Sequence, residues 1–98
     1  MAKQIIKTDK APAPIGPYNQ AVKANGFLFI SGQVAIDPAT NELIKGSVKD
    51  ETHQVMKNVK AILEEAKITF DHAIKTTIFL SDMSLFAEVN EVYGSYFS

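Results

Sequence analysis

Cysteine and arginine are both absent from this chain of 98 residues, and all ten of its basic side chains are lysines. The lack of cysteine excludes a disulfide framework and any chemistry that needs a thiolate. The lack of arginine removes the planar side chain that binds a carboxylate through two parallel hydrogen bonds, because lysine offers only a point charge. These residues alone therefore cannot supply a function that depends on that two-point contact.

Long apolar runs and a strong net charge are also missing from the sequence. No stretch is long enough to span a bilayer, and the amino-terminus lacks the basic and then apolar order of a signal peptide. We therefore expect a cytoplasmic protein without a membrane partner. The formal net charge of −1 argues against a nucleic-acid partner, because a dedicated nucleic-acid surface usually shows a basic excess.

The stretch around which the chain is organised is residues 27–33. Its first four residues, 27–30, are bulky and apolar, which predicts a short strand buried on both faces. Ser31 and Gly32 follow, and a glycine lets a ligand or another backbone come close because it has no Cβ. We interpret the end of this strand as the floor of a small-molecule site. A bulge or bend with a surface serine is the alternative.

The preceding residues predict a hairpin that contains this strand. Asn25-Gly26 is a strong signal for a two-residue turn, since both central positions need a positive φ. The turn joins residues 21–24 to residues 27–30 as antiparallel strands. Residues 3–7 predict one further short strand.

Between the first strand and the hairpin, residues 8–17 hold three of the four prolines. Proline lacks a donor and restricts its predecessor, so this segment is expected to be an extended crossing loop. Tyr18 follows directly on Gly16-Pro17, and the backbone should therefore set the position of its ring. Two roles remain open for Tyr18, namely anchoring the loop by packing or contacting a ligand.

Ser47 marks the start of a helical pattern. Apolar residues recur at helical spacing at Val55, Val59, Ile62 and Ala66, while charged residues lie largely on the other side. Ser47 is suited to cap this amphipathic helix at its amino-terminus.

The remaining residues predict a strand and a second helix. The β-branched stretch at residues 73–80 predicts the strand, and Ser81-Asp82 can cap the helix that follows. The helix has an apolar row that includes Phe86 and Val89, and Asn90 falls within the buried arc. A buried asparagine must satisfy its amide, so Asn90 is either a functional residue or a solvated residue at the rim.

This order of elements predicts an α+β domain over residues 1–98, with a sheet covered on one face by two helices. The predicted strand at residues 73–80 has few partners among the strands that precede it. We therefore expect that the carboxy-terminal strands of the sheet are absent from this chain.

The residues alone indicate no catalytic centre. His53 and His72 are far apart in sequence and have no ligand spacing, so no metal site is expected. A glycine-rich phosphate loop and a G-x-S-x-G nucleophile elbow are both missing.

Several spaced motifs nevertheless resemble the RidA (YjgF) family. They are residues 14–21, residues 29–33, Asp37-Pro38, residues 54–63 and residues 86–97, which cover nearly the whole chain in order. The resemblance implies a chorismate-mutase-like α+β fold, assembled as a homotrimer with clefts between subunits. It also implies hydrolysis of the reactive acids 2-aminoacrylate and 2-aminocrotonate to 2-oxo acids and ammonia, with water as the reagent and no cofactor.

Residue by residue, the resemblance assigns substrate binding to Tyr18, Ser31, Gly32 and Asn90. The family's carboxylate-binding arginine and water-positioning glutamate match no residue here and are expected beyond Ser98, so the isolated 98-residue chain should be inactive. Two other roles remain open. One is a ligand-sensing or regulatory binding module of the same fold, and the other is a translation inhibitor that cleaves RNA.

Overall fold

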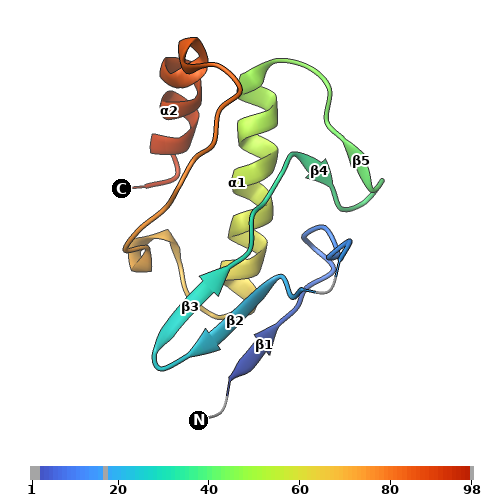
Figure 1. Cartoon of the computed structure of the whole chain (residues 1–98), viewed down its shortest axis with the longest axis vertical. Coiled ribbons are helices and arrows are strands. Elements are labelled where there is room, and N and C mark those ends of the chain that lie inside the picture. The colour runs from blue at the N-terminus through green and yellow to red at the C-terminus, as the bar shows by residue number, and fades with distance from the viewer. Residues whose placement is uncertain (1–2, 17, 98) are drawn as a thin grey trace.

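The computed structural model describes residues 3–16 and 18–97 of the chain. The elements in chain order are strands β1 (Gln4–Ile6), β2 (Ala21–Ala24), β3 (Phe27–Ile30), β4 (Ile36–Asp37) and β5 (Glu42–Leu43), helix α1 (Val48–Glu65), 3-10 turns η1 (Phe70–His72) and η2 (Met83–Leu85), and helix α2 (Phe86–Gly94). Figure 1 shows the carboxy-terminal part of α1 against the β1–β3 sheet and α2 beside the opposite half of α1. The two helices and the antiparallel strands form an α+β fold, which confirms the predicted class.

The three-stranded sheet has the order β1-β2-β3, and all of its pairs are antiparallel. Asn25 and Gly26 have φ values of 54° and 79°, as a two-residue hairpin turn between β2 and β3 requires. The predicted hairpin and the predicted first strand are both confirmed. Ile5, Val22 and Phe29 are paired in register across the three strands and share one face of the sheet.

The prediction that β3 is buried on both faces is wrong. Leu28 and Ile30 pack against the core, whereas the alternate residues Phe27 and Phe29 are 53% and 63% exposed. The physical reason is that α1 covers one face of the sheet only, so the strand's period of two sends every second side chain outward.

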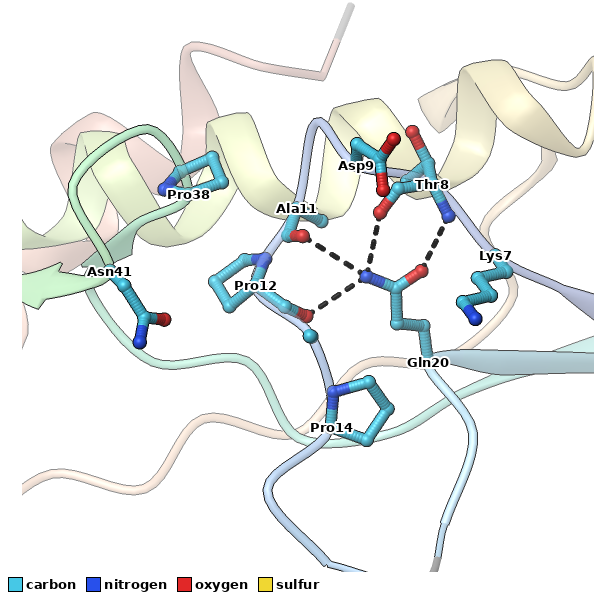
Figure 2. A pocket seen from close by; sticks show the side chains of 10 residues that line it. Lys7, Thr8, Asp9, Ala11, Pro12, Pro14, Gln20, Pro38 and Asn41 are labelled. Carbon is cyan, nitrogen blue, oxygen red and sulfur yellow. Dashed lines mark hydrogen bonds between the residues drawn. The ribbon is translucent and has the colours of Figure 1, made fainter.

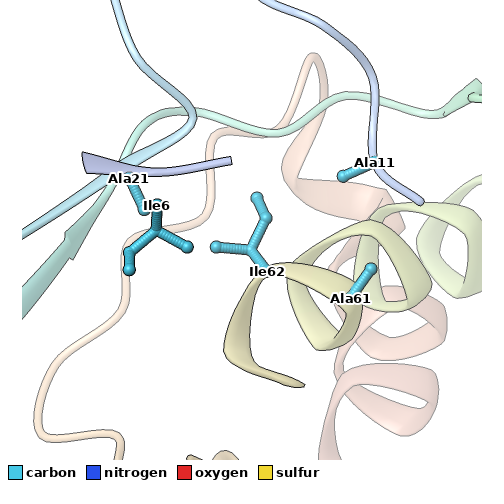
Figure 3. Close-up of a cluster of buried hydrophobic side chains, with 5 residues drawn as sticks. All are labelled: Ile6, Ala11, Ala21, Ala61 and Ile62. Carbon is cyan, nitrogen blue, oxygen red and sulfur yellow. The ribbon is translucent and has the colours of Figure 1, made fainter. Parts of the chain in front are cut away.

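The core lies between the sheet and α1 (Figure 3). Ile6 and Ala21 on the strands meet Ala61 and Ile62 on the helix. Ala11, from the loop at residues 8–16 that we call the proline-rich loop, lies at the edge of the cluster. The Ser47 hydroxyl accepts a hydrogen bond from the Asp50 N–H at 3.1 Å, so the predicted start and cap of the helix are confirmed. The apolar contact of Ile6 and Ala21 with Ala61 and Ile62 fixes the sheet relative to α1.

Asn58 on α1 is completely buried and forms polar contacts with the backbone that follows β3. Its Nδ2 donates to the carbonyls of Val34 and Ile36 at 3.0 and 2.9 Å, and its Oδ1 accepts from Gln54 Nε2 at 2.9 Å. The amide is therefore satisfied. It ties the backbone that follows β3 to the helix.

Residues 73–80 were predicted to be a strand, and this prediction is wrong. The segment has no regular secondary structure. Within residues 3–16 and 18–97, the sheet that was expected to include it contains only β1, β2 and β3. Ile74 and Phe79 are 84% and 93% exposed. A β-branched sequence favours extended backbone, yet a strand forms only where a neighbouring strand supplies its hydrogen-bond partners.

The second predicted helix is confirmed, with a short 3-10 turn before it. Asp82 Oδ1 accepts from the Ser84 N–H at 2.9 Å at the start of that turn. Hydrogen bonds from Ser84 hold the pKa of the Asp82 carboxyl below its usual value. Because the folded pKa is lowered, this cap contributes stability above the carboxyl's ordinary pKa and loses it as the pH falls through the lowered value.

Replacing Asn58 should destabilise the fold markedly. In Asn58→Ala the carbonyls of Val34 and Ile36 lose their donor inside the core, which should lower the free energy of unfolding by about 1–3 kcal/mol. Lys57→Ala changes the neighbouring exposed position on the same helix and should stay within about 0.5 kcal/mol of wild type. Urea unfolding followed by circular dichroism measures both, and equal values for the two variants would contradict the structural role of Asn58.

Candidate functional site

A shallow pocket lies where the proline-rich loop meets the end of β3. Its volume is about 40 Å³, and its lining includes Tyr18, Ser31 and Gly32 together with Pro14 and Ile15. Three of the four residues predicted to bind a substrate thus lie together. The pocket is too small to enclose a ligand of several atoms, so these residues form one wall of a site rather than a complete one.

Ser31 is held in place by Gln20, the residue that immediately precedes β2. Its N–H and its hydroxyl both donate to the Gln20 carbonyl, each at 3.0 Å. Because the hydroxyl proton is used within the protein, the oxygen lone pairs of Ser31 remain to accept hydrogen bonds from a ligand. The geometry suits an acceptor in a binding site.

Gly32 is exposed, and a Cβ placed there would meet no heavy atom within 4 Å. Packing among the described residues therefore does not require a glycine. Any side chain would instead occupy the open space beside Ser31. This observation fits the predicted site floor, where the missing side chain leaves room for a ligand.

Tyr18 is half exposed and folds back over its own loop. Its N–H donates to the Gly16 carbonyl at 2.8 Å, and its phenol oxygen lies 3.5 Å from the Ile15 N–H, at the limit for a hydrogen bond. The ring thus both supports the loop and lines the pocket. Pro17, which was expected to set the ring position, lies outside the described residues.

Asn90 does not join this group. It is exposed, which overturns its predicted place in a buried arc of the second helix. The residues that α2 buries are Val89 and Val92, a narrow stripe that directs Asn90 elsewhere. Asn90 does not line the pocket that holds the other three residues.

Both histidines make local contacts away from the pocket. His53 Nδ1 lies 2.9 Å from the Tyr96 hydroxyl, and the two rings meet edge to face. His72 Nδ1 accepts from the Thr69 N–H at 3.2 Å. Burial raises the pKa of the Tyr96 phenol. The His53–Tyr96 contact joins α1 to the residues that follow α2, whereas the His72–Thr69 contact stays within the η1 turn.

Sequence reasoning missed the structural importance of two buried amides, Gln20 and Asn58. Both lie within quoted family motifs, but no periodicity marks a polar side chain as buried when its partners are backbone carbonyls far along the chain. One signal was available for Gln20. The nearby loop is rich in proline and therefore poor in backbone N–H donors, so its carbonyls need a donor from a side chain such as Gln20.

The described residues hold no metal-binding group of three or more histidine, aspartate or glutamate side chains. In that same part of the chain, no helix is long and apolar enough to cross a bilayer.

A second cavity of about 250 Å³ shares Pro12, Pro14 and Gln20 with the pocket and is also lined by Lys7 and Asp9. The proline-rich loop is therefore a common wall of both hollows.

Comparison with known proteins supplies the family. The sequence model of a family described as Endoribonuclease L-PSP matches residues 8–98. A RutC family protein of Pyrococcus horikoshii is 56% identical over 95 residues, covering 97% of this chain and 75% of that protein. The chain belongs to the RidA (YjgF) family.

Two further RidA relatives support the assignment. A 2-iminobutanoate/2-iminopropanoate deaminase of Mus musculus is 46% identical over 95 residues, covering 97% of this chain and 70% of the mouse protein. The crystal structure of RidA from an Antarctic Psychrobacter superimposes with a TM-score of 0.91 at 45% identity, covering 97% of this chain and 76% of that one. The resemblance of the sequence motifs to the RidA family is thus confirmed.

Proposed function

We propose that this protein is a cytoplasmic hydrolase that converts reactive 2-imino acids, formed from 2-aminoacrylate and 2-aminocrotonate, to 2-oxo acids and ammonia. The observation that carries the proposal is the gathering of Tyr18, Ser31 and Gly32 at one pocket in a member of the RidA family. The similarity to a mouse protein named for this reaction supports it.

The reaction needs binding and water but no electron transfer. Water adds to the imine carbon, a proton moves to nitrogen, and ammonia leaves as the carbonyl forms, so that 2-iminopropanoate and water become pyruvate and ammonia. The oxygen of Ser31 is placed to accept an N–H hydrogen bond from the substrate, since its own proton goes to the Gln20 carbonyl. Gly32 leaves room beside it, and the Tyr18 ring covers the loop side.

The substrate carboxylate needs a partner that donates two parallel hydrogen bonds, and residues 1–98 contain no side chain of that kind. Arginine is absent from the 98 residues, and the chain spans about three quarters of the length of the RutC relative. Our proposal assigns this contact to the family arginine, and the positioning of water to the family glutamate, that the resemblance implies beyond Ser98. The natural full-length protein is therefore the sample to assay.

The full-length protein should accelerate imine hydrolysis. A serine dehydratase generates 2-aminoacrylate, and lactate dehydrogenase follows the release of pyruvate with and without the protein. We expect a faster release that scales with protein concentration. If the rate of pyruvate release is unchanged at saturating protein and the protein binds 2-oxobutanoate, the enzymatic proposal is overturned and a ligand-sensing module is favoured.

The same sample separates small acids from RNA, the substrate suggested by the family's endoribonuclease description. The net charge of residues 1–98 is −1, which offers phosphate groups no basic surface, so RNA binding should be slight and fall steeply with salt. RNA cleavage or tight RNA binding at physiological salt would favour the RNA-directed function instead.

We also propose that the protein is a homotrimer with clefts shared between subunits. The uncovered face of the sheet carries the in-register row Ile5, Val22 and Phe29, beside exposed Phe27, which is a surface suited to association. A shared cleft would also explain why the pocket is shallow and why Asn90 is outside it.

Charging the sheet face should break this assembly. Sedimentation of the wild-type protein should report a trimer, and Phe29→Lys should shift it towards monomer because an ammonium would enter the apolar contact. Leu43→Lys, at a similarly exposed apolar residue on β5, should leave the trimer intact. A stable wild-type monomer at micromolar concentration would contradict the shared cleft.

If Asn90 binds substrate across a subunit contact, Asn90→Ala should reduce activity without reducing stability. Losing a hydrogen bond to a charged ligand costs about 1.5–3 kcal/mol, or roughly 10–100-fold in kcat/KM. The melting temperature should not change because the side chain is exposed in the subunit. Wild-type kcat/KM in this variant would exclude Asn90 from the site.

A further inference from the structure

Gln20 connects two parts of the molecule that lie on either side of the candidate site. It immediately precedes β2, is 3% exposed, and points its carboxamide into the proline-rich loop (Figure 2). Oε1 accepts from the Thr8 N–H at 2.7 Å, and Nε2 donates to the carbonyls of Thr8, Ala11 and Pro12 at 3.0, 3.1 and 2.9 Å. One side-chain amide thus binds the backbone of three loop residues.

The backbone of the same residue holds the other side of the site. The Gln20 carbonyl accepts from both the N–H and the hydroxyl of Ser31. The side chain therefore fixes the loop, and the main chain fixes the site floor. The loop lines the pocket through Pro12 and Pro14, and the segment after β3 lines it through Ser31 and Gly32.

The loop is poorly equipped to hold its own position. Pro12 and Pro14 have no N–H, so this segment cannot form a continuous ladder with a neighbouring strand. Its backbone carbonyls need donors from elsewhere, and the carboxamide of Gln20 supplies them. The shape of the loop should consequently depend on this one side chain more than on local backbone preference.

We propose that Gln20 is a positioning residue of the site, which sets the separation between the proline-rich loop and the Ser31-Gly32 floor. This inference rests on the proposed function for its effect on catalysis. Gln20 itself touches no substrate in this scheme, because its polar atoms are all used within the protein. It acts through Ser31 and through the loop.

Gln20→Glu tests the proposal with almost no change in shape. The new carboxylate has no proton to donate and would face three carbonyl oxygens, whereas the protonated acid can donate to one of them. The folded state should therefore raise the pKa of the new carboxyl. The charged groups that line the adjacent cavity are Lys7 and Asp9, both exposed, and Tyr18 lines the pocket.

The sign of the pH dependence follows from the raised pKa. The unfolded carboxyl ionises near its ordinary value of about 4.3, while the folded one resists ionisation. The variant should thus approach wild type below about pH 4.3 and lose stability as the pH rises through the folded pKa. Gln4→Glu makes the same chemical change at an exposed residue of β1 and serves as the matched control.

Activity is measured in the full-length protein at a temperature where circular dichroism shows each variant fully folded. Relative to wild type, Gln20→Glu should lose about 10–100-fold in kcat/KM for the imine at pH 7.5 and recover part of that loss at pH 5.5. Gln4→Glu should match wild type at both pH values. Wild-type kcat/KM in a folded but destabilised Gln20→Glu would reduce Gln20 to a purely structural role and overturn the proposal.

A second readout does not depend on any substrate. In Gln20→Met, which keeps the length of the side chain but none of its hydrogen bonds, the Thr8 amide should exchange its hydrogen at least about tenfold faster, and the Ser31 amide should also lose protection. Unchanged exchange at both amides would overturn the proposal. If the wild-type protein hydrolyses no imine, the proposed function fails, and this exchange experiment still decides whether Gln20 holds the loop and the floor together.

Discussion

The hydrogen bonds of one buried carboxamide, that of Gln20, connect the proline-rich loop to the hairpin and so underlie the rest of the site. Prolines make the loop stiff but deprive it of donors, and a loop of this kind can pack closely only where a side chain satisfies its carbonyls. Asn58 on α1 performs the same task for the backbone that follows β3. These two side-chain amides hold the two backbone segments that line the pocket, the proline-rich loop and the segment after β3. Apolar packing alone would leave their buried carbonyls without hydrogen-bond partners.

A second constraint is that helix α1 covers only one face of the sheet. Alternate residues of β3 must then face outward, and Phe27 and Phe29 do so on the sheet face that also carries Ile5. A large exposed apolar face is unusual for a protein that works as a monomer. In our proposal, a neighbouring subunit would cover this sheet face and complete the shallow pocket, which would link the assembly to the chemistry.

The proposed imine hydrolysis would need little from the protein beyond placement of the substrate and water. Hydrolysis of an imine uses water as its reagent, so the enzyme gains most by orienting the substrate and holding hydrogen-bond acceptors and donors ready. Ser31 fits this requirement because the Gln20 carbonyl takes its proton and fixes its oxygen. Positioning residues are therefore as important to such a site as the residues that touch the substrate.

The sequence by itself determined the elements whose causes are local. The Asn25-Gly26 turn and the Ser47 cap each depend on residues a few positions apart, and both are present as predicted. Of the predicted apolar row of α1, Ile62 is buried, whereas Val55, Val59 and Ala66 are only half-buried. Its family motifs also brought Tyr18, Ser31 and Gly32 to notice. Only the tertiary structure decided that β3 is exposed on one face, that residues 73–80 form no ladder, and that Asn90 lies outside the pocket. Those outcomes depend on what lies beside a segment in space, because burial and strand pairing are properties of contacts between distant residues and not of local pattern.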